Sequence, residues 1–245
     1  DLIQAVLGLS RSQFDVLSRR FCPMIECTDE NGQLLKNSSG RRRSIGSIKQ
    51  LVLFLFWIRQ YPTVRVMSWI FHVPLSVIHR SINHCTALFE SYYSKLVVWP
   101  ERAIRDYHSE WLRGWRISVV IDGCEQKVLV PIVKLSERAL YSGKKRLHTF
   151  TLLLACAPDG HIFYLSPSYN GAKNDMNVYE MPENQVHQGL DADEAIIADK
   201  GYVGVAHYHS RVALPILGQE SLLTVEELEY NNEHKSKRIV VENVF

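Results

Sequence analysis

The sequence has no long hydrophobic run and no close group of cysteines. Its longest apolar stretch, residues 51–58, is far shorter than the roughly 20 residues that a membrane-spanning helix needs, and no signal-peptide pattern opens the chain. The five cysteines form no CxxC pair, whereas structural zinc takes about four ligands at short spacings. We therefore expect a soluble protein without a membrane segment, whose cysteines are reduced thiols of the cytosol or nucleus.

A strong excess of charge of either sign is also missing. The formal net charge is +2, which neither requires nor excludes nucleic acid, so local clusters matter more. One cluster, Arg41, Arg42 and Arg43, lies in a polar loop. It is a candidate DNA-contacting arm, with a solvated loop or a nuclear-import signal as alternatives. The other cluster, residues 144–146 together with His148, predicts phosphate contacts or a solvated hairpin tip.

The first 114 residues are predicted to be helical. Residues 2–8 are short and apolar, Ser10 is a predicted N-cap for residues 11–21, and proline and glycine signals separate the later segments. The later predicted helices cover residues 47–59, 63–71 and 75–89, and an aromatic-rich helix or linker covers residues 100–114.

Residues 63–71 and 75–89 are joined by only three residues, which is typical of a helix-turn-helix. Apolar residues line one face of the second helix at helical spacing. Arginine and asparagine on its other face are able to make bidentate contacts with base edges. The candidate DNA-reading residues are Ser76, His79, Arg80 and Asn83. A plain solvated helix face is the alternative.

From residue 115 onward the pattern changes to strands. Predicted strands cover residues 117–121, 126–130, 147–157, 161–166 and 195–198, and Pro158-Asp159-Gly160 is a hairpin signal. A helix interrupted by Pro182 is expected over residues 178–188. Thr224 is a predicted cap for a Glu-rich helix, and residues 235–245 form a last helical segment. Strands that meander, then a crossover helix, a strand and a helix, are the order of a ribonuclease H-like α/β (α+β) fold, a mixed sheet with flanking helices.

Three carboxylates in this half are candidates for binding a divalent metal. Asp122 and Asp199 each follow an apolar strand and precede glycine or Lys-Gly, so both are expected at strand ends. Mg²⁺ prefers such oxygen ligands. Glu242 is polar within an apolar helical stretch and is expected to point at the same place, although a surface pair with Arg238 is the alternative. Cleavage of a phosphodiester by two metals needs acids of this kind.

Asp175 is a fourth candidate acid. It falls where the chain leaves a strand for a helix, so an N-cap role is the simplest interpretation. It is also the alternative second metal-binding acid, or an outer group of the site.

Taken together, these residues resemble the DDE-type endonuclease domain of PIF/Harbinger transposases and the related IS5 group. The matching pieces are DGCE at 122–125, YSGKKRLHT at 141–149, DGHI at 159–162, YNG at 169–171 through Asp175, IADKGY at 197–202 and RIVVENVF at 238–245. The helical segment 41–89 resembles the helix-turn-helix region that precedes that domain.

The resemblance implies a nuclear, metal-dependent DNA endonuclease and transposase. It would use two Mg²⁺ or Mn²⁺ ions to cleave element ends and transfer the 3′ ends to target DNA. Asp122 matches the first acid, Asp199 the second and Glu242 the last, while Lys200 joins the candidate DNA-contacting residues. Double-stranded DNA is the expected substrate. A homodimer, and a Myb-like partner protein, are the expected protein partners.

Two other functions fit the same residues. One is a domesticated DNA-binding or scaffolding protein without catalysis, and the other is a hydrolase acting on RNA. The domains are expected at residues 1–114 and 115–245. Because Phe245 falls within a helical pattern, we expect the nuclease domain to continue beyond it.

Overall fold

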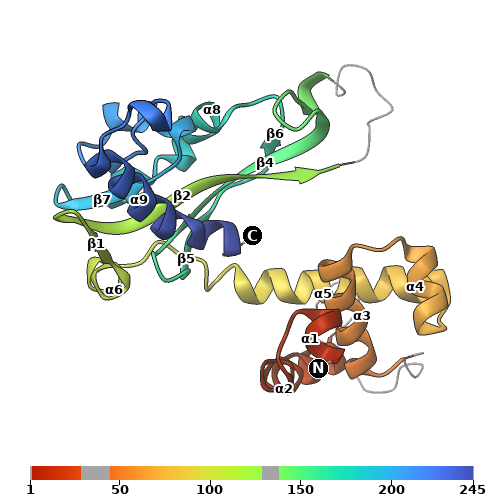
Figure 1. Ribbon diagram of the computed structural model, residues 1–245. Coiled ribbons are helices and arrows are strands. Elements are labelled where there is room, and N and C mark those ends of the chain that lie inside the picture. Colours follow the sequence, from red (N-terminus) through yellow and green to blue (C-terminus); the bar gives the residue numbers. More distant parts are fainter. Residues whose placement is uncertain (1, 29–44, 129–137, 245) are drawn as a thin grey trace. The chain divides into compact units, whose positions relative to one another are not determined.

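The protein folds into two compact units, which we describe separately, Asp1–Leu96 and Val97–Phe245. The structure is a computed structural model, and it describes residues 2–28, 45–128 and 138–244 (Figure 1). The predicted basic arm, Arg41 to Arg43, lies outside the described residues. In the parts that the structure describes, no helix combines the length and apolar character needed to cross a membrane.

The first unit is helical, as the sequence predicts. Its capping box at Ser10 is confirmed: the Ser10 hydroxyl accepts from the Gln13 amide, and the Gln13 side chain accepts from the Ser10 amide. The second and fifth helices of this unit extend beyond their predicted C-terminal ends. The ring of Phe21 stacks on Phe89 and Tyr93, and this contact lengthens the packed core. The helices are α1 Leu2–Leu7, α2 Arg11–Cys27, α3 Ser47–Gln60, α4 Val64–Phe71 and α5 Leu75–Tyr93.

Helices α4 and α5 form the predicted pair with a three-residue connection. Thr63 caps α4 through the Val66 amide, and His72 ends it in the left-handed conformation at φ 52°. Val73 is buried in the connection. Along α5, the predicted apolar face is buried at Ile78, Ile82 and Cys85, whereas Leu75, predicted with them, is 44% exposed. The candidate DNA-reading residues on the open face are all exposed: Ser76, His79, Arg80 and Asn83.

The second unit is built on a mixed sheet. Strand β2 is its centre: it pairs antiparallel with β4 and parallel with β7, and β5 forms the predicted hairpin with β4. Figure 1 shows β2 and β4 as the two longest strands. The strands are β1 Glu110–Leu112, β2 Trp115–Lys127, β3 Tyr141–Ser142, β4 Leu147–Cys156, β5 Ile162–Leu165, β6 Tyr169–Asn170, β7 Glu194–Ile197 and β8 Val212–Ala213.

The prediction of separate strands over residues 117–121 and 126–130, with Asp122 at the end of the first, is wrong. Strand β2 is continuous, and its pairing with β4 runs without a break from Val120 to Lys127. The backbone hydrogen bonds of the ladder therefore continue through both residues, and Asp122 lies inside the strand instead of ending it. Residues 97–114 also pack with this unit, because β1 pairs antiparallel with β2.

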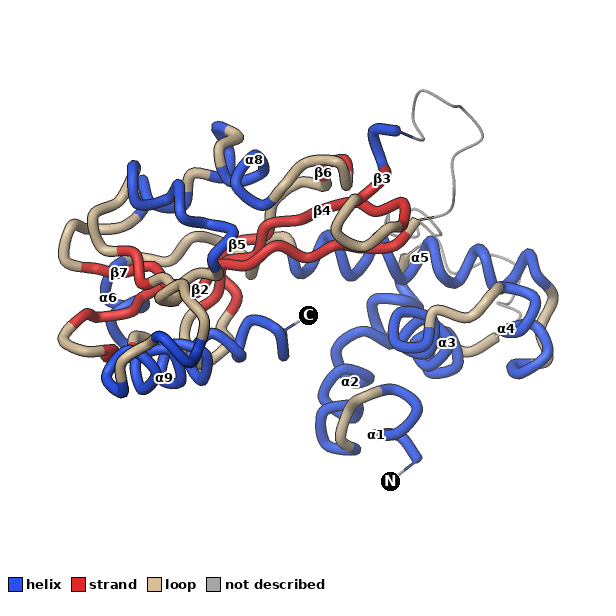
Figure 2. Tube along the Cα trace, turned by 45° about the horizontal axis from the view of Figure 1, so that its top comes forward, coloured by secondary structure: helices blue, strands red, loops and turns tan. Residues whose placement is uncertain are grey.

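Helices cover both faces of the sheet. On one face, Val119 and Ile121 of β2 pack with Val178 and Tyr179 of helix α8. On the other face, Val120 packs with residues of helix α9. Figure 2, turned from the first view, shows the two helices on separate sides of the strands. The helices are α6 Arg102–His108, α8 Asp175–Tyr179 and α9 Val225–Val244, with 3-10 segments at Pro182–Asn184, Val186–Gly189, Lys200–His207 and Glu220–Leu222.

Two helix predictions need correction. The helix expected over residues 178–188 is replaced by α8 and two short 3-10 segments, because Pro182 cannot continue an α-helix. The two helical segments expected near the C-terminal end are one helix, α9. Its capping residue is the predicted one: the Thr224 hydroxyl accepts from the Glu227 amide, and the Glu227 carboxylate accepts from the Thr224 amide. This architecture is compatible with a ribonuclease H-like fold.

A buried histidine fixes α9 to the sheet beside Asp199. The Nε2–H of His234 donates to the carbonyl oxygens of Ala198 and Ala213, each at 3.1 Å. Burial lowers the pKa of His234 from its ordinary value of 6.5. The unfolded chain therefore takes up a proton that the folded chain resists. The stability from this neutral ring is complete above pH about 6.5 and is lost as the pH falls through the lowered folded pKa.

We predict that His234→Gln, which keeps a donor but cannot titrate, flattens the pH dependence of stability. The free energy of unfolding, measured by urea denaturation between pH 7 and 5 with chelator present, should fall less steeply for the variant than for the wild type. His207→Gln, at an exposed histidine, is the matched control and should behave as wild type. Equal slopes for wild type and His234→Gln would contradict the assignment.

Candidate active site

Three of the predicted acids come together in one pocket. Asp122 lies in β2, Asp199 lies two residues beyond the end of β7, and Glu242 lies in the last turns of α9. Val120 of β2 is in register with Ile197 of the parallel strand β7, so Asp122 and Asp199, each two residues further on, lie at the same level of the sheet. The pocket has a volume of about 340 Å³, and the charged residues that line it are Asp122, Glu125, Asp199, Glu242, Lys144, Lys145 and Arg238.

Asp122 is more enclosed than Glu242, with 19% of its side chain exposed against 52%. Its Oδ1 accepts from the Gly123 amide at 2.8 Å, and its Oδ2 accepts from Arg238 Nη1 at 2.9 Å. Burial raises the pKa of Asp122, and the nearby carboxylates of Asp175 and Asp199 raise it further, while the Gly123 amide and Arg238 lower it. The net upward direction means that a negative charge is costly here and is stabilised by added positive charge.

Arg238 joins two of the acids. Besides its bond to Asp122, its Nη2 donates to Glu242, four residues later on the same helix. The surface pair that the sequence offered as an alternative for Glu242 is therefore present, and Glu242 lines the pocket as well. The Glu242 side chain is 52% exposed, so this pair by itself contributes only about 0.3–0.5 kcal/mol. The position of Glu242 in the same pocket as Asp122 says more about its role than the energy of this pair.

Asp199 is held by the local backbone. It caps the 3-10 segment that starts at Lys200, and its Oδ1 accepts from the Lys200 amide at 2.7 Å. The side chain is half-buried. A short apolar strand ending at Ile197 delivers the carboxylate to the pocket, as the sequence predicts. Lys200 itself is exposed and does not line the pocket.

Asp175 does not serve as the helix cap. Asn174 is the N-cap of α8, since its side chain accepts from the Asn177 amide at 2.7 Å, and Asp175 is the first helical residue. The Asp175 side chain is 22% exposed, and its Oδ2 lies 3.5 Å from Lys144 Nζ. The N-cap prediction is wrong by one position, because asparagine forms the same cap one residue earlier.

The comparison with protein families agrees with this geometry. The family described as "DDE superfamily endonuclease" matches residues 121–245, just over half of the chain. The chain belongs to this family. In the same comparisons, no curated protein and no solved structure matches the chain significantly. Membership indicates a transposase-like nuclease domain acting on DNA, and DDE endonucleases generally use divalent metal ions.

The acids of this DDE endonuclease fit a divalent cation by their chemistry. Carboxylate oxygens are the ligands that Mg²⁺ prefers, and in this structure the Arg238 guanidinium binds two of the acids at once. Within the described residues, no group of three or more histidine, cysteine, aspartate or glutamate side chains is close enough to form a complete metal centre. The positive charge that the acids need is therefore supplied by Arg238 here.

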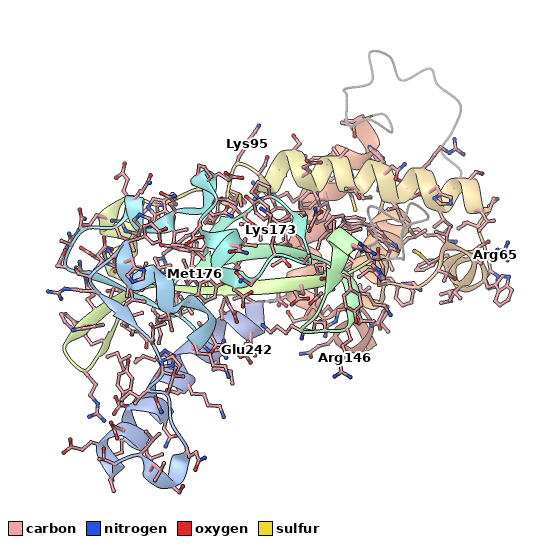
Figure 3. All side chains as sticks on the ribbon, turned by 90° about the horizontal axis from the view of Figure 1, so that it is seen from above. Arg65, Lys95, Arg146, Lys173, Met176 and Glu242 are labelled. Carbon is pink, nitrogen blue, oxygen red and sulfur yellow. The ribbon has the colours of Figure 1, made fainter. Side chains whose placement is uncertain are left out.

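Sequence reasoning placed some residues of the DDE domain correctly and missed others. Lys144 and Lys145 line the pocket, whereas Arg146 and His148, predicted with them, do not. Arg146 is exposed at the hairpin tip (Figure 3), and the His148 ring meets Tyr141. Arg238 was considered only as a partner of Glu242. The signal that it belongs to the site was its spacing, which puts both side chains on one face of the helix.

We predict that Arg238→Gln destabilises the metal-free DDE domain. Asp122 would lose the positive charge that offsets its burial, at a cost of about 1–3 kcal/mol in the free energy of unfolding. Asp122→Asn added to Arg238→Gln should restore most of the loss. Lys237→Gln removes a neighbouring, more exposed pair with Glu110 and should cost less than about 1 kcal/mol. Equal effects of Arg238→Gln and Lys237→Gln in denaturant unfolding would show that the Asp122 pair is unimportant.

Proposed function

We propose that the chain is a transposase of PIF/Harbinger type that cleaves DNA phosphodiester bonds with Asp122, Asp199 and Glu242. The observation that carries the proposal is their convergence: one acid in β2, one just beyond β7 and one in the distant helix α9 line one pocket. An acidic pocket needs a reason to bring like charges together at a cost in stability. Holding divalent cations against a polyanionic substrate is the reason that fits this family.

The lysines beside the acids explain how a polyanion approaches them. Lys144 and Lys145 lie on the loop between β3 and β4 and line the pocket. Two ammonium groups at this edge attract DNA phosphates and orient the backbone without reading its sequence. Arg238 has to release Asp122 and Glu242 when cations occupy the site, and its freed guanidinium is then available to a phosphate.

A different structural element holds each of the three acids in place. Asp122 projects from a continuous strand, Asp199 is fixed by the Lys200 amide, and Glu242 comes from a helix packed on the sheet. When bound, two divalent ions would activate the attacking water and stabilise the leaving 3′ oxygen. The carboxylates hold the ions in place and need not exchange protons themselves.

We predict that nicking of supercoiled DNA requires a divalent metal and each of the three acids. Asp122→Asn, Asp199→Asn and Glu242→Gln keep the size of the side chain and remove the charge, so strand cleavage in Mg²⁺ or Mn²⁺ should fall by orders of magnitude. Folding should survive, and DNA binding should change much less, because lysine and arginine make the phosphate contacts.

The control is Glu183→Gln, at an exposed acid of a 3-10 segment outside the pocket, which should nick as wild type. Wild type that nicks in neither metal would contradict catalysis and leave a DNA-binding or scaffolding protein. Normal cutting by Glu242→Gln would reduce that residue to the surface partner of Arg238.

The helical unit supports a second part of the proposal, that α5 reads DNA sequence. Its open face presents the exposed side chains of Ser76, Arg80 and Asn83. Among the residues that the structure describes, Arg80 makes only a long bond, 3.4 Å from its Nε to the Ser76 carbonyl oxygen. Its guanidinium therefore keeps donors for a base edge or phosphate.

We predict that Arg80→Ala weakens binding to the preferred DNA sequence by about 1–3 kcal/mol, and binding to other DNA by less. Arg19→Ala is the matched control, because Arg19 is also exposed and also donates from Nε to the carbonyl four residues earlier. Titration by fluorescence anisotropy distinguishes the outcomes. An equal loss on all DNA would mean phosphate contact only, and no loss would leave α5 as a scaffold helix.

A further inference from the structure

Two histidines and a carboxylate lie together at the turn between β4 and β5. His108 is the last residue of α6, Asp159 lies in the turn, and His161 directly precedes β5. None of the three lines the acidic pocket. The imidazole rings of His108 and His161 stack on each other, with their centroids 4.8 Å apart and their planes 17° from parallel. Two side chains of a metal-binding type therefore meet from distant parts of the chain.

Asp159 fixes the position of the hydrogen on the His108 ring. Its Oδ2 lies 2.5 Å from His108 Nδ1, and its Oδ1 accepts from the His161 backbone amide at 3.1 Å. Burial raises the pKa of Asp159, but the bonds from the His108 ring and the His161 amide together lower it below its ordinary value. An ionised carboxylate only accepts hydrogen bonds. His108 Nδ1 therefore carries the hydrogen, and Nε2 of the neutral ring keeps a free electron pair.

This hydrogen bond is the one that usually accompanies a metal-binding histidine. Such a histidine binds the metal through one ring nitrogen and donates the N–H of the other to a carboxylate, which fixes the tautomer and makes the binding nitrogen more basic. Within the described residues, neither His108 Nε2 nor the ring nitrogens of His161 have a hydrogen-bond partner. These nitrogens are available to a ligand.

A buried phenylalanine packs against both rings. The Phe163 centroid lies 5.7 Å from that of His161 and 6.4 Å from that of His108, and its ring meets theirs at 58° and 71°. Phe163 is only 1% exposed, so it forms a fixed apolar support for the pair. Apolar surroundings of this kind limit the access of water to metal-binding side chains.

The ion pair between His108 and Asp159 does not by itself explain the arrangement. The Asp159 side chain is 48% exposed and that of His108 is 18% exposed, and exposed pairs contribute little to stability. The pair also involves only one of the two rings. Two stacked imidazoles repel each other when both are protonated. A metal ion binds neutral imidazole, which is the state in which this stack is stable.

We propose that His108 and His161 form a second metal site, for a transition-metal ion such as Zn²⁺ or Ni²⁺, with Asp159 as a positioning residue. These ions favour imidazole nitrogen, whereas Mg²⁺ favours oxygen. Because no group of three metal-binding side chains is present in the parts that the structure describes, water supplies the remaining ligands. Two nitrogens on a tetrahedral ion lie roughly 3.4 Å apart, a separation that a tilt of the exposed His161 ring provides.

The bound ion would join α6 to the β4–β5 hairpin. The middle of α6 is held to the start of β7 by the buried pair of Arg105 with Glu194. An ion at His108 adds a connection from the last residue of the helix to a different part of the sheet. The site therefore stabilises the fold and takes no part in DNA cleavage, so it goes beyond the proposed function.

Isothermal titration with Ni²⁺ tests the site, with millimolar Mg²⁺ present to compete for the acidic pocket. His161→Gln and His108→Gln should each weaken Ni²⁺ binding by about ten-fold or more. Asp159→Asn keeps an acceptor for the His161 amide but loses the charge that holds the His108 ring, and should weaken binding by about ten-fold. His207→Gln, at another exposed histidine, is the control and should bind Ni²⁺ as wild type.

Thermal unfolding gives a second measurement. Ni²⁺ should raise the unfolding temperature of the wild type by several degrees, because it binds the folded chain, and should raise that of His161→Gln much less. With chelator present, the two proteins should unfold at the same temperature, which establishes that the variant is folded. Both should nick DNA equally in Mg²⁺.

Loss of Ni²⁺ binding from both histidine variants, with binding kept by His207→Gln, supports the site. Wild-type binding by either His108→Gln or His161→Gln overturns the paired site. An equal loss in His207→Gln also overturns it, because the ions would then bind diffusely to surface imidazoles. Asp122→Asn should bind Ni²⁺ at the histidines as wild type does, so failure of the proposed nuclease activity leaves this inference standing.

Discussion

Repulsion among carboxylates is the constraint on which the second unit depends. Asp122, Asp175 and Asp199 lie close enough for the two others to raise the pKa of Asp122, and burial adds to that cost. The chain offsets it with single contacts: Arg238 on Asp122 and Glu242, Lys144 on Asp175, and one backbone amide each for Asp122 and Asp199. A site that is costly to keep charged when empty is one that binds cations strongly, since the cation removes the repulsion.

The topology of the sheet brings these carboxylates close together. Because β2 continues past the end of β7, it carries Asp122 to the pocket that Arg238 and Glu242 of α9 also line. Asp199 arrives at the same level by parallel pairing. His234 holds α9 against the carbonyls of Ala198 and Ala213, and that contact fixes the helix on which Arg238 and Glu242 lie. The apolar core and the acidic pocket thus share the same strands.

Much of this was predictable from local sequence. The hairpin at residues 158–160, the capping of α9 by Thr224 and the convergence of the acids on one place all follow from short patterns. What local patterns could not show depends on distant residues. The Asp122-Gly123 pair predicts the end of a strand, but Gly123 lies inside β2 and leaves space for Asp175 from another part of the chain. The role of Arg238 depends on Asp122, which lies 116 residues away from it in the sequence.

The most direct test of the account is X-ray diffraction from crystals grown with Mn²⁺, using the anomalous signal of the metal. The account predicts Mn²⁺ peaks between Asp122, Asp199 and Glu242, with Arg238 moved off Asp122. Well-ordered crystals at millimolar Mn²⁺ that show no anomalous peak in this pocket, with Arg238 still bonded to Asp122, would contradict it. The pocket would then be an ion-paired surface of a protein that has kept the DDE fold without its chemistry.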